Sequence, residues 1–265
     1  MGILQEFSLS NKVALVTGAS GHIGRKTCAY LAELGANLVL VDRDQDALGG
    51  LRDELCSQYD VDVQVIVCDL ESESSRTNLH LEYSRSHSRL DVLIHLAAFV
   101  GTAELTGWAV PFEQQELGTW RRAIEVNLTS MFHLAQLFSP ELSAADTASV
   151  IAVGSIYAKF APDWSLYHGT PMGNPAAYSA SKAGLLQLTR WLATTLPPSV
   201  RVNSISPGGV FRSQSPEFVS RYERKVPMGR MATEDDVARS ILFLATPLSS
   251  YVTGQDLAVD GGWGV

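Results

Sequence analysis

The segment Tyr178-Ser179-Ala180-Ser181-Lys182 combines a phenol and an ammonium at a spacing that suits proton transfer. Residues four apart on a helix share a face, so a helix through this segment would turn the Tyr178 hydroxyl and the Lys182 ammonium toward one site. A phenol has a pKa of about 10 and is a poor base at neutral pH, but a neighbouring ammonium lowers that pKa by stabilising the phenolate. The pair is therefore predicted to exchange a proton with a hydroxyl or carbonyl oxygen.

A glycine-rich turn, Thr17-Gly18-Ala19-Ser20-Gly21-His22-Ile23-Gly24, follows an apolar run and precedes a helix-patterned segment from Arg25 to Leu34. Glycine is needed where a turn is too tight for a Cβ atom or where backbone approaches a phosphate closely. An ordinary turn also uses glycine, but the strand before and the helix after favour a dinucleotide-binding turn, with pyrophosphate at the helix N-terminus. The cofactor contacts expected here are Gly18, Ser20, Gly21, His22, Ile23 and Gly24.

An acid ends the second apolar run, in Val41-Asp42-Arg43. An acid at this point accepts hydrogen bonds from the adenosine ribose and repels a 2′-phosphate, so Asp42 favours NAD over NADP. Arg43 could instead pair with a 2′-phosphate, and Asp42 could merely cap the next helix. We expect NAD as the cofactor, with Asp69 and Leu70, after the third run, near the adenine.

Short apolar runs alternate with longer helix-patterned segments along the whole chain. Continuous apolar runs indicate strands buried on both faces, as in a parallel sheet covered by helices. The alternation predicts an α/β fold, a Rossmann-like doubly wound sheet forming one domain over residues 1–265, with ligands bound beyond the carboxyl ends of the strands. The expected strands are Val13–Thr17, Leu38–Val41, Val63–Val67, Val92–Leu96, Val150–Val153, Val202–Ile205 and Leu257–Val259.

The composition limits which kinds of molecule the protein is expected to bind. Hydrophobic residues make up 46% of the chain, enough for a sizeable core, and the net charge of −8 argues against nucleic-acid binding. Three scattered cysteines, Cys28, Cys56 and Cys68, suggest free thiols in a reducing compartment, with no metal site. We expect a cytoplasmic protein that acts on a small molecule and does not bind a membrane.

Taken in order, the motifs resemble those of the short-chain dehydrogenase/reductase family over nearly the whole chain. The resemblance implies that Tyr178 is the general acid/base, that Lys182 lowers its pKa and holds the nicotinamide ribose, that Ser155 binds the substrate oxygen, and that Asn127 supports a proton relay through water. It also implies cofactor contacts at Ala97, Ala98, Pro207, Gly208 and Val210. The matching segments are Thr17–Gly24, Asn127-Leu128-Thr129, Ser155, Tyr178 with Lys182, Pro207-Gly208, Val252-Thr253-Gly254 and Asp260-Gly261-Gly262.

Three features depart from the compact branch of that family. The turn reads TGxxGxxG, and Ile94-His95-Leu96-Ala97-Ala98 follows the fourth strand, as in the extended branch that acts on nucleotide sugars. The segment between Ser155 and Tyr178 is also longer, with an insertion over about 158–173. Its aromatic and polar side chains suggest a pocket for a sugar-like ligand, or a loop that packs on the body. The expected substrate contacts are Tyr157, Trp164, Tyr167, His168 and Arg212.

These observations predict an NAD(P)-dependent oxidoreductase that interconverts a secondary alcohol and a ketone, with a sugar or sugar-derived substrate and a lid over about 209–228. The alternatives are a nucleotide-sugar epimerase or dehydratase that recycles its NAD, a 3-ketoacyl reductase, and a dinucleotide-binding protein without catalysis. The resemblance further implies a homodimer or homotetramer, paired through Ala238–Ala245 and the last strand.

Overall fold

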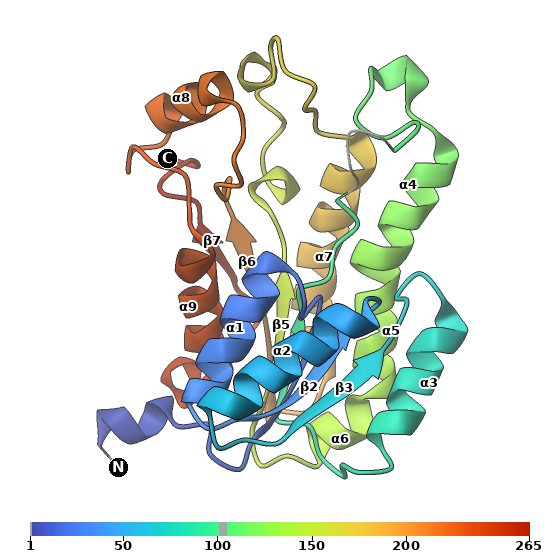
Figure 1. Ribbon diagram of the computed structural model, residues 1–265, viewed down its shortest axis with the longest axis vertical. Coiled ribbons are helices and arrows are strands. Elements are labelled where there is room, and N and C mark those ends of the chain that lie inside the picture. Colours follow the sequence, from blue (N-terminus) through green and yellow to red (C-terminus); the bar gives the residue numbers. More distant parts are fainter. Residues whose placement is uncertain (1, 101–104) are drawn as a thin grey trace.

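In the computed structural model, which describes residues 2–100 and 105–265, seven strands form one parallel sheet in the order β3-β2-β1-β4-β5-β6-β7 (Figure 1). The order reverses between β1 and β4, so their carboxyl ends flank a crevice at which such sheets bind ligands. The Rossmann-like fold class expected from the sequence is confirmed. The strands are β1 (Val13–Thr17), β2 (Asn37–Asp42), β3 (Val63–Val67), β4 (Val92–His95), β5 (Ala148–Val153), β6 (Val200–Pro207) and β7 (Asp256–Val259).

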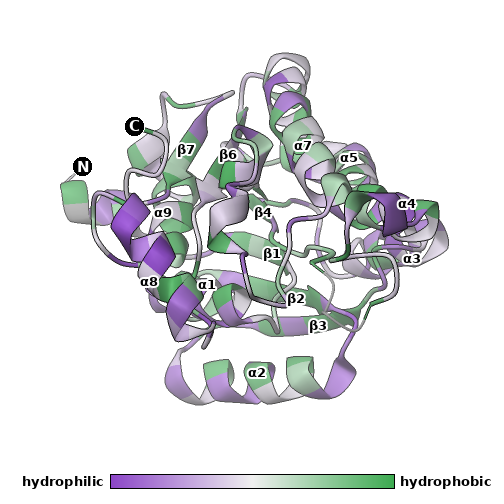
Figure 2. Ribbon diagram, turned by 90° about the horizontal axis from the view of Figure 1, so that it is seen from above, coloured by the Kyte–Doolittle hydropathy of each residue, from purple (hydrophilic) through white to green (hydrophobic). Residues whose placement is uncertain are grey.

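Helices cover both faces of the sheet (Figure 2). Helices α1, α2 and α9 pack on one face, and α3, α5 and α7 pack on the other. Strand β1 is apolar from Val13 to Val16 because successive side chains point to opposite faces and both faces are covered: Leu15 joins one buried cluster, and Ala14 and Val16 join the other. The helices are α1 (His22–Glu33), α2 (Gln45–Gln58), α3 (Glu73–Tyr83), α4 (Leu117–Ile124), α5 (Ser130–Leu137), α6 (Ser139–Ser143), α7 (Ala176–Thr195), α8 (Pro216–Lys225) and α9 (Glu234–Ala245).

Several helices begin at residues that cap their free amides. The side chains of Asp44, Ser72 and Ser215 accept hydrogen bonds from the first turns of α2, α3 and α8. Thr233 and Asp236 form a reciprocal capping box at the start of α9. Because Asp44 caps α2, Asp42 is free of that role. In the part of the chain that the structure describes, no helix has the length and apolar character needed to cross a bilayer.

The elements differ from the sequence expectations mainly at their ends. Strands β5 and β6 start two residues earlier than expected, because Ala148 and Val200 pair in register at the edge of the apolar runs. The fourth strand ends at His95, one residue early, because the amide of Leu96 turns to the Thr17 hydroxyl. Helix α1 starts at His22 rather than Arg25, which brings its N-terminus to the glycine-rich turn.

Candidate active site

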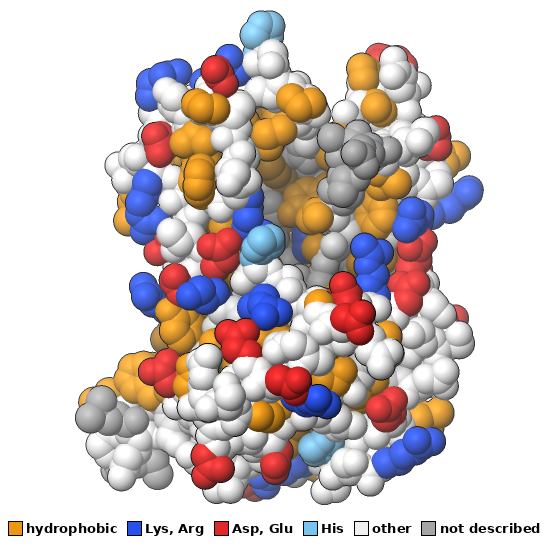
Figure 3. Space-filling view, in the orientation of Figure 1, with side chains coloured by type: hydrophobic (Ala, Val, Ile, Leu, Met, Phe, Trp, Pro, Cys, Tyr) orange, Lys and Arg blue, Asp and Glu red, His pale blue; other side chains and the backbone are white. Residues whose placement is uncertain are grey.

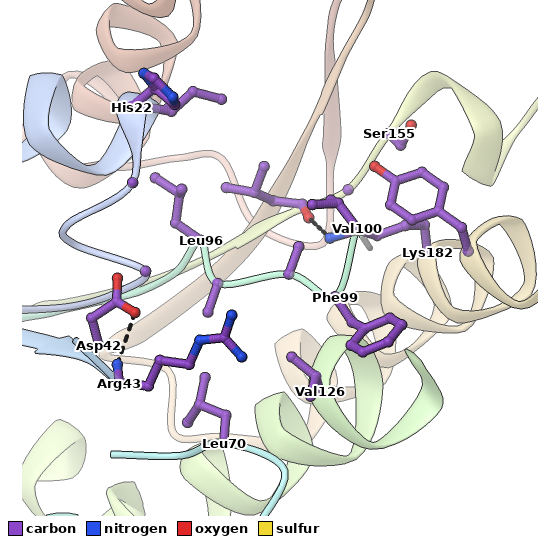
Figure 4. A pocket seen from close by; sticks show the side chains of 18 of the residues that line it. His22, Asp42, Arg43, Leu70, Leu96, Phe99, Val100, Val126, Ser155 and Lys182 are labelled. Carbon is purple, nitrogen blue, oxygen red and sulfur yellow. Dashed lines mark hydrogen bonds between the residues drawn. The ribbon is translucent and has the colours of Figure 1, made fainter. Parts of the chain in front are cut away.

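A cavity of about 670 Å³ opens at the carboxyl ends of the strands, where Figure 3 shows the surface hollowed and walled by hydrophobic side chains. Ser155 and Lys182 lie at one end, and Asp42 and Arg43 lie at the other (Figure 4). The structure thus gathers most of the expected site residues around one space. The expected residues that line it are Gly18, Gly21, His22, Ile23, Asp42, Arg43, Asp69, Leu70, Ala97, Ala98, Ser155, Tyr178, Lys182, Pro207, Gly208, Val210 and Arg212.

The glycine-rich turn has no room for a side chain at Gly18 or Gly24. Gly18 has a φ of +69°, and a Cβ atom there would lie 2.7 Å from the backbone nitrogen of Ala97. A Cβ atom at Gly24 would lie 2.1 Å from the carbonyl oxygen of Gly18, so Gly24 allows α1 to pack on the turn and does not itself line the cavity. The first amides of a helix lack partners within it, and His22 and Ile23 face the cavity there. This donor set fits a pyrophosphate.

Ser20 contacts Asp42 and is absent from the cavity wall. Its backbone amide and hydroxyl donate to Oδ2 of Asp42 at 3.1 and 2.6 Å, and the amide of Arg43 donates to Oδ1 at 2.8 Å. Ser20 thus fixes the carboxylate, and its direct contact with the cofactor stays a prediction. Arg43 is exposed and, among residues 2–100 and 105–265, has no carboxylate within ion-pairing distance. An acid and a free cation thus stand side by side at this end.

His95, at the end of β4, lies directly behind the cavity wall and links β1 to α5, although it was not expected to belong to the site. Its Nδ1 lies 3.2 Å from the Thr17 hydroxyl, and its Nε2 lies 3.3 Å from the Ser130 hydroxyl. Ser130 donates to the carbonyl oxygen of Val126, so it accepts from Nε2, and Thr17 is left to donate to Nδ1. Burial, with a smaller contribution from the charge of Lys182, lowers the pKa of His95 to about 3. The imidazole is therefore a neutral hydrogen-bonding bridge.

Asn127 is buried in a π-helical turn, Glu125–Thr129, between α4 and α5. Its Oδ1 accepts from the amide of Phe99 at 2.6 Å, and its Nδ2 donates to the Ser181 hydroxyl at 2.9 Å. The side chain thus holds the segment after β4 against α7 and does not line the cavity. Wide helical turns of this kind are frequent at functional sites because they free backbone carbonyls.

Tyr178 and Lys182 project from the first turns of α7, as their spacing predicts. Lys182 is 2% exposed, and its ammonium lies 5.9 Å from the centre of the Tyr178 ring and donates to the carbonyl oxygen of Val153 at 2.7 Å. Burial lowers the pKa of Lys182 to about 8. Burial also raises the pKa of Tyr178, and a hydrogen bond with Ser155 lowers it in part. The Lys182 ammonium is turned to the carbonyl oxygen of Val153, and its lowering of the pKa of Tyr178 stays a prediction.

The insertion packs on α8 instead of lining the cavity. Tyr157, Trp164, Tyr167 and His168 all lie outside the cavity wall, so of the five expected substrate contacts only Arg212 faces it. Tyr157 and Tyr167 share a hydrogen bond of 2.5 Å between their hydroxyls, and Trp164 is 61% exposed. Tyr157 and Tyr167 pack in one cluster with Phe218 and Tyr222 of α8.

Sequence reasoning missed part of the wall near Tyr178. Phe99, Val100, Leu105 and Val126 give it apolar surface, and Arg122 stacks 4.9 Å above the ring of Phe99. No local motif marks these residues, because they come together only when the segment after β4 meets α4 and α7.

Comparisons with known proteins agree with this arrangement. A family model described as enoyl-(acyl carrier protein) reductase matches residues 18–264. The rhamnolipids biosynthesis 3-oxoacyl-(acyl-carrier-protein) reductase of Pseudomonas aeruginosa is 33% identical over 270 residues, covering 97% of this chain and 98% of that protein. The galactitol 2-dehydrogenase (L-tagatose-forming) of Cereibacter sphaeroides is 30% identical over 269 residues, covering 98% and 97%.

Solved structures show the same likeness. A NAD(P)-dependent gluconate 5-dehydrogenase structure from Beutenbergia cavernae, with NADP bound at low occupancy, matches with a TM-score of 0.85 and 30% identity over 97% of this chain and 98% of that chain. An active-site complex of RhlG with NADP from Pseudomonas aeruginosa matches with a TM-score of 0.85 and 30% identity, covering 98% and 99%. This chain therefore belongs to the short-chain dehydrogenase/reductase family and is an NAD(P)-dependent oxidoreductase.

Proposed function

We propose that the protein interconverts a secondary alcohol and a ketone by hydride transfer, with Ser155, Tyr178 and Lys182 as its catalytic residues. The observation that carries this proposal is their convergence at one end of a cavity whose other end fits a dinucleotide. When bound, the nicotinamide ring supplies the hydride acceptor or donor. In alcohol oxidation, the substrate loses a hydride from carbon and a proton from its hydroxyl.

The chain's own residues handle that proton. Ser155 holds the substrate oxygen by a hydrogen bond, and the Tyr178 oxygen, next to Ser155, takes or returns the proton. The lysine ammonium stabilises the phenolate once it turns from Val153 toward the phenol. Asn127 acts indirectly, because its amide fixes the segment after β4 and the start of α7.

Substitution of Tyr178 tests this assignment. We expect Tyr178→Phe to lower kcat by at least about 100-fold, the usual contribution of a general acid/base, while NADH binding measured by fluorescence is retained. Tyr167→Phe is the matched control, because it removes a phenol hydroxyl outside the cavity and should leave kcat unchanged. Equal activity of Tyr178→Phe and wild type would refute the role. A changed product without net NADH change would favour an epimerase or dehydratase.

We propose NAD as the preferred cofactor. Three hydrogen bonds from Ser20 and Arg43 hold the Asp42 carboxylate at the end of β2, where its charge disfavours a 2′-phosphate. The relatives solved with NADP support the alternative, for which Arg43 is the available cation. Asp42→Ala should shift the ratio of kcat/KM for NAD over NADP by about tenfold toward NADP, or about 1.4 kcal/mol, because it removes the carboxylate that repels a 2′-phosphate. A wild type that prefers NADP would refute the proposal.

We propose a sugar or sugar-derived alcohol as the substrate class. Two relatives that span this chain at 30% identity are named for galactitol and gluconate. A 3-ketoacyl substrate is the second candidate, because Phe99, Val100 and Leu105 present apolar surface and the acyl reductase of Pseudomonas aeruginosa is 33% identical. Values of kcat/KM on polyols, sugar acids and 3-hydroxyacyl thioesters, measured with one enzyme preparation, distinguish the two classes.

We further propose that the protein is a homo-oligomer paired through α9 and β7. The buried face of α9 packs on its own chain through Val237, Ile241 and Leu244. What remains for a partner is the outer face, where Phe243 and Leu257 are 38% and 37% exposed. Light scattering should give a dimer or tetramer, and Phe243→Glu should dissociate it; a monomeric wild type would refute the assignment.

A further inference from the structure

Tyr222 connects helix α8 to the loop after β6. Its side chain is 2% exposed, and its hydroxyl accepts a hydrogen bond from the amide of Gly209 at 2.6 Å. A Cβ atom at Gly208 would lie 2.6 Å from this hydroxyl, and one at Gly209 would lie 2.8 Å from the ring. The two glycines therefore form a slot that the phenol fills.

The loop is fixed on its other sides by backbone hydrogen bonds. The amide of Gly208 donates to the carbonyl oxygen of Val259 at 3.0 Å, and the amide of Ala232 donates to the carbonyl oxygen of Gly209 at 2.9 Å. Pro207, Gly208 and Val210 line the cavity. Tyr222 is thus the contact through which α8 acts on this part of the cavity wall.

The position of Tyr222 is set in turn by the insertion and the C-terminus. Its ring stacks on Trp263, with centroids 5.1 Å apart, and Lys225 lies 4.5 Å above the Trp263 ring. Phe218 lies one turn before Tyr222 on the same face of α8, and its ring contacts Tyr167 of the insertion at 5.7 Å between ring centroids.

Hydrogen bonds and an ion pair also fix α8 to the insertion. The guanidinium of Arg221 donates to the carbonyl oxygens of Leu166 and His168 at 3.3 and 2.5 Å, and Lys225 pairs with Asp163. Burial raises the pKa of Tyr222 to about 12, so the phenol keeps its proton while it accepts from Gly209. The insertion that distinguishes this chain therefore holds α8 in place.

We propose that Tyr222 is a positioning residue that sets the Pro207–Val210 backbone against the nicotinamide end of the cofactor, and that the insertion acts through it. This inference rests on the proposed function, in which the nicotinamide lies beside Ser155 and Tyr178, and on the lining of the same cavity by Pro207, Gly208 and Val210. In this proposal the insertion holds α8, and α8 positions the cofactor through Tyr222. The insertion does not need to contact the substrate.

Calorimetric titration with NADH and with ADP-ribose, which lacks the nicotinamide, tests the proposal in the full-length protein. Tyr222→Phe leaves the Gly209 amide without its acceptor, and we expect NADH to bind about tenfold more weakly while ADP-ribose binding changes less than about twofold. Tyr167→Phe is the matched control, because it removes a phenol hydroxyl from the same cluster and keeps the ring that contacts Phe218, so both affinities should stay unchanged. Gly209→Ala, which pushes on the Tyr222 ring, should reproduce the loss for NADH.

The outcomes distinguish failure of the nicotinamide placement from failure of the positioning role of Tyr222. Equal affinity of the wild type for NADH and ADP-ribose would refute the placement of the nicotinamide itself. A wild-type preference for NADH that Tyr222→Phe preserves would overturn only the positioning role. Equal weakening of both ligands, with a lower Tm, would show that Tyr222 serves the fold alone and would also overturn it.

Discussion

Replacement of Lys182 by methionine should change the stability of the protein in a pH-dependent way. The side chain is 2% exposed, and burial lowers its pKa from the ordinary value of 10.5 to about 8. Between these two values the unfolded chain binds the proton and the folded protein does not, so wild-type stability rises with pH across this window. Below pH 8 both states carry the charge, and the cost of burying it is constant.

The magnitude follows from the pKa difference. At 1.36 kcal/mol per pKa unit, the shift from 10.5 to about 8 corresponds to about 3 kcal/mol in the free energy of unfolding. The methionine variant lacks this ionisation and also lacks the hydrogen bond to Val153, which adds an offset that does not vary with pH. The stability of wild type minus that of Lys182→Met should therefore increase by about 3 kcal/mol between pH 8 and pH 10.5.

Denaturant unfolding of both proteins at one protein concentration, over pH 7 to 10.5, measures this difference. The subtraction removes the titration of every group that the two proteins share. Leu186→Met, a buried substitution on the same helix that removes no ionisable group, is the control and should give a flat difference. A flat difference for Lys182→Met, or one that decreases with pH, would refute the claim that burial depresses the pKa of this ammonium.

Three further predictions concern packing around the cavity. Gly24→Ala should lower the free energy of unfolding by about 1–3 kcal/mol and abolish dinucleotide binding, because its Cβ atom meets backbone at 2.1 Å; Gly49→Ala, in open space on α2, should instead stabilise by about 0.5–1 kcal/mol. His95→Leu should lower the free energy of unfolding, measured by thermal denaturation, by about 1–3 kcal/mol, since two buried hydroxyls lose this partner. It should also raise KM for the dinucleotide. Lys225→Gln should speed NADH release in stopped-flow fluorescence, whereas Arg224→Gln should not, because Lys225 pairs with Asp163 of the insertion and Arg224 donates to Ser220 of its own helix.

Each of these predictions has a clear contrary result. Retained dinucleotide binding in Gly24→Ala would mean that the turn relaxes around a methyl group. A lower Tm with an unchanged KM in His95→Leu would limit His95 to the fold. Equal release rates in Lys225→Gln and Arg224→Gln would show that the ion pair with the insertion does not restrain α8.

The parts of the site that could be predicted depend on neighbours in sequence. Tyr178 and Lys182 share a face of α7 because a helix repeats every 3.6 residues. Gly18 stands at a tight turn directly after β1, and Asp42 ends β2, so the strand pattern alone places both at the carboxyl edge of the sheet. Asn127 was placed near the site, but its amide contacts could not be foreseen.

The sequence by itself therefore determined the α/β class, the order of the strands along the chain, the dinucleotide turn and the phenol–ammonium pair. Only the tertiary structure decided that His95 bridges Thr17 and Ser130, that Tyr222 fills the slot at Gly208 and Gly209, and that the insertion packs on α8. The physical reason is the range of the contacts. Helix and strand periodicity acts over a few residues, whereas these side chains meet only after the sheet has aligned distant segments and burial has selected their partners.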